Sequence, residues 1–272
     1  MHKDQTEDSY NNMSSACIRT YQINSMFERY SILLDRAVKI VKKALSVSNS
    51  NFYIAFSGGK DSLVLLDIVT KLKRDTRIYF FDSGAEFPDT LDLINFYAKK
   101  YNIDIIKPKL SILEIYRKVD AFGYVGAEKQ YELDNKLTEI LIKEPSRRVI
   151  NMGRHNGVFM GLRKEESRVR RYMLNMRSEL FFCKYDQIYH CNPLLDFTAK
   201  DVWSYILTNH LRYNRVYDKK WVLNREQLRV GTYAGCTVST IARNGRWAFL
   251  KKHYPEQWNK FALEFPFIKS YC

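Results

Sequence analysis

Short apolar segments of two different periods alternate along the first half of this chain. Residues 51–56 (NFYIAF), 77–81 (RIYFF) and 103–106 (IDII) are aromatic or β-branched and short, as is typical of buried strands. Apolar residues recur at helical spacing in four other segments: 26–45, 61–72, 90–101 and 111–117. Strands that alternate with helices need crossover connections, which produce a parallel sheet covered on both faces. The pattern therefore predicts a doubly wound, mostly parallel α/β fold.

The second half of the chain is less regular. Residues 121–151 are charged and have no clear period, so we expect a partly mobile insertion that covers the functional site. Residues 158–162 predict another strand, and the dense charged run 163–171 follows it.

Two later segments predict helices. Residues 198–209 have helical period, with Thr198 as N-cap and Asp201 at the reciprocal position of a capping box. Residues 241–267 are aromatic and basic, and they predict a helical tail with a break near Pro255.

These patterns predict one large domain with appendages. Residues 1–21 are polar and lack a sustained apolar period, so we expect a mobile N-terminal arm. Residues 22–235 form the predicted α/β domain, and residues 236–272 form a helical extension packed on it. A chain of 272 residues is long enough to bury a large core.

Composition limits the class of protein. No run approaches the roughly 18 apolar residues of a membrane span, and the N-terminus has no apolar signal region. The odd number of scattered cysteines, five, is typical of a reduced protein, so we expect a cytoplasmic location without membrane contact. The 44 basic and 30 acidic residues leave a net charge of +14, which favours encounters with polyanions. A nucleic-acid partner and a lysine-rich nucleotide enzyme both remain open, because charge alone does not locate the basic residues.

A glycine-rich segment follows the first predicted strand and opens the next helix. Its residues are Ser57, Gly58, Gly59, Lys60, Asp61 and Ser62. The glycines allow a tight turn and let phosphate oxygens approach the amides, while the helix N-terminus contributes N–H groups and a favourable dipole. Ser57 and Ser62 can donate hydroxyl hydrogen bonds, and Lys60 adds positive charge. This is not the loop of kinases and GTPases, because Asp61 follows the Gly-Lys pair where Ser or Thr is required.

The segment matches the SGGxDS pattern of the PP-loop ATP pyrophosphatase superfamily, and the full set of motifs resembles its PAPS reductase branch. The motifs stand in the family's order: FSGGKDSLVLL (56–66), FDSGAEFPDT (81–90), GLRKEESRVR (161–170) and PLLDFTAKDVWSYI (193–206). The resemblance implies the adenine nucleotide alpha hydrolase-like fold. It also implies that the loop binds the β and γ phosphates of ATP as the leaving pyrophosphate, with Lys60 and Asp61 as catalytic residues.

The segment after the second strand supplies further candidates. The resemblance implies that Asp82, Ser83 and Glu86 line the nucleoside side of the pocket. A carboxylate there could bind ribose hydroxyls or Mg²⁺, which prefers oxygen ligands and bridges substrate phosphates. The alternative is an ordinary loop in which Asp82 caps the following turn.

The segment that begins at Gly161 is similar to the GIRxxES motif of the reductase branch, with an arginine after it. Guanidinium groups bind phosphate bidentately, so Arg163 and Arg168 are candidate clamps on the α phosphate or a second substrate. Arg170 and Arg171 extend the positive run toward a polyanion, although a solvated charged helix would have the same pattern.

The cysteines bear on the type of reaction. Reductases of this branch carry a nucleophilic Cys in a Glu-Cys-Gly-x-His setting, whereas this sequence ends in Ser-Tyr-Cys272. Cys236 has Ser239 three positions on, so four thiolates at cluster spacing are absent and we expect no iron–sulfur cluster. Cys236 is either a sulfur-carrying catalytic residue or a small buried side chain. We predict no metal-binding residues, because four of the histidines show no ligand spacing among themselves: His155, His190, His210 and His253.

The sequence thus predicts an ATP pyrophosphatase that adenylates an acceptor for sulfur transfer, with ATP and Mg²⁺ bound. Components of DNA phosphorothioation systems are closest in kind, which implies DNA and a cysteine desulfurase as partners and leaves a homodimer open. The alternatives are a PAPS or APS reductase with a divergent thiol and an FAD synthetase-type adenylyltransferase. A non-enzymatic, nucleotide-gated nucleic-acid-binding subunit is the third hypothesis.

Overall fold

A six-stranded sheet forms the centre of the protein. The computed structural model describes residues 13–47, 49–118, 135–228, 230 and 245–272. The strands are β1 (Phe52–Ala55), β2 (Arg77–Phe81), β3 (Ile103–Ile106), β4 (Gly157–Phe159), β5 (Leu180–Cys183) and β6 (Ile188–Cys191). Their order in the sheet is β3-β2-β1-β4-β6-β5. Only β5 runs antiparallel to its neighbour among these strands, which confirms the predicted mostly parallel α/β fold.

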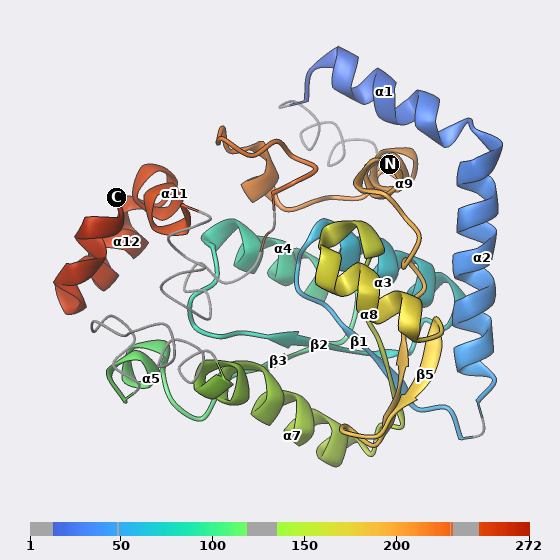
Figure 1. Ribbon diagram of the computed structural model, residues 1–272, viewed down its shortest axis with the longest axis horizontal. Coiled ribbons are helices and arrows are strands. Elements are labelled where there is room, and N and C mark those ends of the chain that lie inside the picture. The colour runs from blue at the N-terminus through green and yellow to red at the C-terminus, as the bar shows by residue number, and fades with distance from the viewer. Residues whose placement is uncertain (1–12, 48, 119–134, 229, 231–244) are drawn as a thin grey trace.

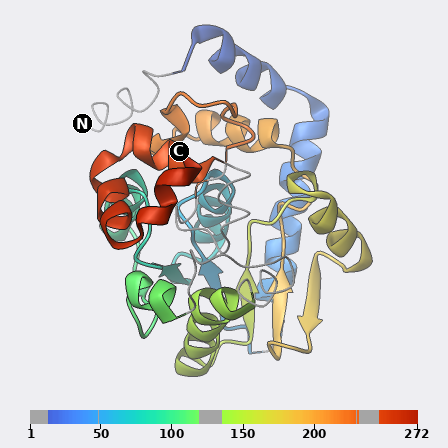
Figure 2. The same cartoon turned by 60° about the vertical axis from the view of Figure 1, so that its left-hand side comes forward.

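Helices lie on both faces of the sheet (Figure 1). The α-helices are α1 (Ser15–Ser25), α2 (Glu28–Leu45), α3 (Lys60–Leu72), α4 (Pro88–Ala98), α5 (Ile112–Lys118), α7 (Glu144–Gly153), α8 (Arg168–Met176), α9 (Ala199–Thr208), α11 (Arg246–His253) and α12 (Pro255–Glu264). The shorter turns are η2 (Glu139–Lys143), η3 (Lys164–Glu166), η4 (Arg215–Asp218) and η5 (Pro266–Tyr271). Figure 2 shows α11 and α12 in red beside the sheet, as the predicted helical C-terminal part with its break at Pro255.

Alternation along the strands divides the interior into two cores. On β1, Phe52 and Ile54 point into a large core that contains side chains of α2, α3 and α9. Tyr53, between them, points the other way into a smaller core with Val149 of α7. Because successive strand side chains face opposite sides of a sheet, one short aromatic segment supplies both layers. This explains why the first strand is apolar at almost every position.

The structure differs from the prediction in three segments. Helix α1 begins at Ser15 and buries Tyr21, so the last part of the expected N-terminal arm is helical. The described end of the expected insertion, residues 135–151, leads into α7 and contributes to the smaller core beneath the sheet. Its residues 119–134 lie outside the described residues. The hairpin of β5 and β6 was not predicted from the sequence.

Helices α1 and α2 are anchored to α9 through a buried carboxylate. Asp201 closes the predicted capping box with Thr198, and its side chain is fully buried. Arg29 of α2 donates to Asp201 at 3.0 Å, and Asn24 of α1 donates to it at 3.0 Å. Burial works to raise the pKa of Asp201, but the bonds from Arg29, Asn24 and Thr198 outweigh it and hold this pKa below its ordinary value.

We expect Asp201→Asn to lower the free energy of unfolding by about 2–4 kcal/mol at pH 7, since the buried charge pair is lost while the half-exposed Arg29 can reach water. A carboxyl group whose pKa is lowered by folding stabilises the folded state at pH values above its unfolded-state pKa. This stabilisation is lost on acidification. The wild type should therefore lose this advantage as the pH falls below the ordinary pKa of 3.8. Urea unfolding at neutral and acidic pH measures both effects. Asp35→Asn, an exposed change on α2, is the matched control, and equal losses in the two variants would contradict the anchoring role.

No helix in the described ranges is both long and apolar enough to cross a lipid bilayer.

Candidate functional site

The candidate site lies where the strand order reverses. Chain order runs from β1 toward β2 and β3 on one side, and the sheet continues through β4 on the other side of β1. Ligands of open α/β sheets bind at such a switch point, beyond the carboxyl ends of the strands. The segments that follow β1 and β4 meet there: a Cβ atom added to Gly161 would lie 3.0 Å from the backbone carbon and oxygen of Asp61. Gly161 therefore allows the close approach of the two segments.

Hydrogen bonds from Asn214 fix the position of the glycine turn after β1. Gly58 has a φ of +70°, the left-handed region in which glycine carries no steric cost. The Asn214 amide nitrogen donates to the Gly58 carbonyl at 3.2 Å and to the Thr90 hydroxyl at 2.8 Å. Asn214 is 1% exposed, so these bonds form away from water. The turn is thereby tied to α4 and to the segment that begins η4.

The start of α3 presents backbone N–H groups. With respect to the residues that the structure describes, the amides of Gly58, Gly59 and Asp61 have no hydrogen-bond acceptor. The amide of Lys60 is different, because it donates to the Tyr217 hydroxyl at 3.0 Å. Ser57 and Ser62 are not both free to act as donors to a ligand, since their hydroxyl oxygens lie 3.0 Å apart and Ser62 donates to the Gly59 carbonyl. The amides and the helix dipole are thus the features of this turn that are suited to an anion.

Charged side chains behind the turn balance one another. Lys60 is 3% exposed, and its ammonium lies 3.3 Å from the Asp61 carboxylate. Arg163, also 3% exposed, donates from Nε to Asp61 at 2.5 Å and from its terminal nitrogen to Glu165 at 2.6 Å. We predicted Arg163 as a phosphate clamp, but its guanidinium is engaged by two carboxylates and the Phe197 carbonyl. In this structure it is a positioning residue that joins the segment after β4 to the turn.

The remaining arginines of the charged run are more exposed. Arg168 is exposed at the first position of α8, and it has no ion-pair partner in the described part of the chain. Arg170 pairs with Glu166, while Arg171 is exposed. Arg168 therefore stays the candidate clamp. Cys236 lies outside the described residues, so its catalytic role stays a prediction.

The segment after β2 contains a carboxyl group with a shifted pKa. Glu86 accepts from the Ser83 hydroxyl at 2.7 Å, and Asp82 accepts from the Gly84 amide at 2.8 Å, as in the capped turn that we considered as the alternative. Burial raises the pKa of Glu86 to about 7, although bonds from Ser83 and the charge of Arg246 act to lower it. Carboxyls that titrate near neutral pH are concentrated at functional sites.

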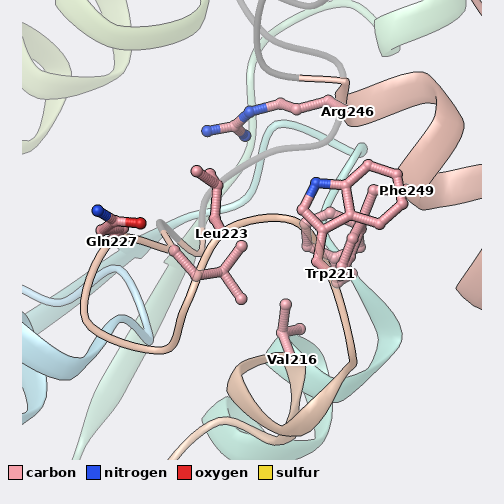
Figure 3. A pocket seen from close by; sticks show the side chains of 8 residues that line it. Val216, Trp221, Leu223, Gln227, Arg246 and Phe249 are labelled. Atoms are coloured by element: carbon pink, nitrogen blue, oxygen red, sulfur yellow. The ribbon is translucent and has the colours of Figure 1, made fainter.

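A cavity of about 340 Å³ adjoins this segment. Its lining residues are Phe87, Val216, Trp221, Leu223, Gln227, Leu228, Arg246 and Phe249. Figure 3 shows Trp221 and Phe249 side by side at one end and the Arg246 side chain extending from the start of α11. The cavity shares η4 with the glycine turn, because Val216 precedes the Tyr217 that contacts Lys60. An apolar cavity with a few polar groups is the usual form of a small-ligand site.

Asn214 and Tyr217 were not predicted as site residues from the sequence. Both lie more than 150 positions from the turn in sequence (separations of 156 and 157), and no pattern connects them to it. The only signal was their place in a polar and aromatic segment after a helix, which is common in ordinary loops. Contacts of this separation become visible only once the chain has folded.

Comparison with known proteins identifies the family. The model of the phosphoadenosine phosphosulfate reductase domain matches residues 51–241, and the chain belongs to this family. An uncharacterised protein of Methanocaldococcus jannaschii is 30% identical over 241 residues, which cover 84% of this chain and 53% of that protein. The chain thus spans about half the length of that relative.

Two further matches have named activities. An adenosine 5′-phosphosulfate reductase of Geobacillus kaustophilus is 32% identical over 202 residues, 71% of this chain and 77% of that enzyme. The crystal structure of a phosphoadenylyl-sulfate reductase from Candida auris, in complex with phosphate, covers 78% of this chain and 96% of its own. Its TM-score is 0.53 at 22% identity, which supports the shared fold.

The two glycines of the turn should respond differently to a methyl group. We expect Gly58→Ala to lower the free energy of unfolding by about 1–2 kcal/mol, because the left-handed backbone is strained for alanine. Gly59→Ala should stay within about 0.5 kcal/mol of the wild type, since reduced unfolded-state entropy offsets a poorer N-cap. Within the part of the chain that the structure describes, the nearest atom to a Cβ added at Gly59 is the Ser57 hydroxyl oxygen at 3.4 Å. Thermal and urea unfolding measure both variants, and a larger loss for Gly59→Ala would refute this geometry.

Glu86 should make stability depend on pH in a defined direction. Its folded-state pKa of about 7 exceeds the ordinary 4.5, so the folded protein binds the extra proton between these values. The free energy of unfolding should therefore fall as the pH rises from about 4.5 to 7, by at most about 3 kcal/mol from this group. Urea unfolding of Glu86→Gln over the same range should show a shallower slope than the wild type. Parallel curves for the two proteins would exclude a raised pKa at this position.

Proposed function

We propose that this protein binds an adenine nucleotide at the glycine turn and acts on a sulfonucleotide, as a reductase of the adenosine 5′-phosphosulfate type. The observation that supports binding most directly is the group of backbone amides at Gly58, Gly59 and Asp61, which have no acceptor within the described ranges of the chain. They surround the N-terminus of α3, where an anion gains both hydrogen bonds and the helix dipole. The buried cations of Lys60 and Arg163 are paired with Asp61 and with the exposed Glu165, so the turn can be held rigidly without a large electrostatic cost.

The choice of substrate class rests on family membership. The chain belongs to the phosphoadenosine phosphosulfate reductase domain family, and a relative at 32% identity is an adenosine 5′-phosphosulfate reductase. These findings favour the sulfonucleotide alternative over nucleic-acid phosphorothioation, which was our first prediction. Such a reaction forms a bond from a thiolate to the sulfur of the substrate and breaks its bond to the phosphate oxygen. AMP leaves with that oxygen, and a second thiol then releases sulfite by forming a disulfide. Cys236 is the candidate first thiol.

The cavity next to the turn suits the nucleoside. Trp221 and Phe249 offer apolar ring surface for a purine, and Arg246 and Gln227 add polar groups. Glu86 precedes Phe87 of the cavity lining and is not itself a lining residue; with a pKa of about 7 it is a candidate hydrogen-bond donor to the nucleoside in its neutral form. This arrangement supports a nucleotide that spans from the cavity to the amides of the turn.

A second candidate function is the splitting of ATP into AMP and pyrophosphate. The observation that favours it is the SGGKDS segment, which agrees with the PP-loop pattern at each of its defined positions. The same free amides would then hold the leaving pyrophosphate. The two functions differ in their products.

Product analysis separates the two reactions. The full chain is incubated with adenosine 5′-phosphosulfate, its 3′-phosphorylated form or Mg·ATP, each with a dithiol reductant. We expect sulfite from a sulfonucleotide and no pyrophosphate from ATP. Pyrophosphate with AMP from ATP alone would replace the proposal by the second candidate. Absence of binding to all three nucleotides in calorimetry would overturn both.

Variants in α3 test whether the turn is the site. We expect Lys60→Ala to lower kcat/KM by about 10²-fold or more, because the charge at the turn is no longer balanced. Gly59→Ala should weaken nucleotide binding although it spares stability, since its methyl group blocks the approach of the anion. Lys71→Ala, an exposed lysine on the same helix, is the matched control and should leave turnover unchanged. Full activity in Lys60→Ala and Gly59→Ala would place the site elsewhere.

A further inference from the structure

Three side chains with metal-ligating atoms converge on the hairpin of β5 and β6. Cys183 ends β5, Asp186 lies in the turn, and His190 is on β6. Cys183 pairs with Ile188 and Phe181 pairs with His190 across the hairpin. Directly opposed residues of an antiparallel pair point to the same face, and alternate residues of one strand share a face. The thiol and the imidazole therefore project from the same side of the hairpin.

The distances between the ligand atoms are short. The Cys183 sulfur, an Asp186 carboxylate oxygen and a His190 ring nitrogen all lie within 4.8 Å of one another. The same oxygen, Oδ2, lies 3.4 Å from the sulfur and 2.8 Å from His190 Nε2. A tetrahedral zinc ion with ordinary bond lengths separates such ligands by about 3.3–3.6 Å. The sulfur and oxygen are already at this spacing, and the oxygen and nitrogen need to open by roughly 0.5 Å when a metal replaces the shared proton.

We propose that Cys183, Asp186 and His190 form a transition-metal site suited to Zn²⁺, with three protein ligands and one position for water. Thiolate, imidazole and carboxylate are the three ligand types that zinc uses in proteins. The side chains are partly buried, with 15% of His190 and 26% of Asp186 exposed, so an ion can enter and retain a water molecule.

The alternative of a nucleophilic triad does not fit the contacts. Asp186 stands between the two other residues and accepts from both, whereas a triad needs the imidazole next to the thiol.

The position of these residues indicates a structural role that is independent of the proposed function. β6 runs parallel to β4, so the turn before β6 lies at the end of the sheet opposite to the carboxyl ends where the glycine turn is found. Among the described strands, β5 is at the edge of the sheet and pairs with β6 alone. A metal that joins the end of β5 to the middle of β6 would stabilise this hairpin, because two strands of four residues each are only marginally stable as an isolated pair.

Cobalt titration tests the site without any measurement of turnover. The full chain is stripped of metal with a chelator and titrated with Co²⁺ while its absorption is recorded. We expect one equivalent to bind with a thiolate-to-cobalt charge-transfer band, and Zn²⁺ to displace it. Zinc-loaded protein should also melt at a higher temperature than the stripped protein. A wild type that develops no thiolate band, or that binds less than one equivalent at micromolar concentration, would overturn the proposal.

Single substitutions assign the ligands. Cys183→Ser should lose the charge-transfer band, and His190→Ala should weaken Co²⁺ binding by at least about tenfold, because loss of a residue that only supports a ligand already costs this much. Cys272→Ser and His253→Ala are matched controls outside the hairpin and should titrate like the wild type. A thiolate band that survives in Cys183→Ser assigns the metal to another cysteine and refutes the site. The wild-type titration decides the question even if a variant fails to fold.

Discussion

The ion pair between Arg163 and Asp61 is the contact on which the architecture of the site depends. It joins the segment after β4 to the first turn of α3 across the switch point of the sheet. The ion pair can form because Gly161 has no Cβ atom. A Cβ atom at this position would meet the backbone of Asp61 and hold the two segments apart. Lys60 and the exposed Glu165 complete the set, so the buried cations Lys60 and Arg163 each have a carboxylate beside them. In a buried network of this kind, a charge without a partner destabilises the folded state, whereas a fully paired set holds its side chains rigidly.

This rigidity has a consequence for how the turn can bind. The cations nearest the turn are already engaged by carboxylates, so they contribute less attraction to a ligand than their charges suggest. Among the residues that the structure describes, no acceptor lies in hydrogen-bond contact with the backbone amides of Gly58, Gly59 and Asp61. Asn214 and Tyr217 are hydrogen-bonded to the turn and fix its backbone. These amides would therefore need little rearrangement to bind an anion. Preorganised donors of this kind are the main electrostatic device of enzyme sites.

Much of the fold was predictable because its periods are strong. Residues 77–81 and 103–106 form strands at the predicted bounds, and α3 begins one residue before its predicted start. The charged network was not predictable. Arg163 carries the same side chain whether it faces a phosphate or Asp61, and only the path of the chain decides between them. The cluster of Cys183, Asp186 and His190 was not predicted either. The spacing of the histidines was considered only among themselves, and not relative to a cysteine and a carboxylate.

The sequence by itself determined the alternation of strands and helices, the glycine turn between the first strand and its helix, and the motifs of the reductase family. These are local properties, set by periodicity and by backbone freedom within a few residues. The tertiary structure decided which charges neutralise one another, which amides stay free, and which aromatic residues line the cavity. Those outcomes depend on contacts between segments far apart in the chain, such as the bond from Tyr217 to Lys60. Such contacts are selected by packing of the whole core, which no local pattern records.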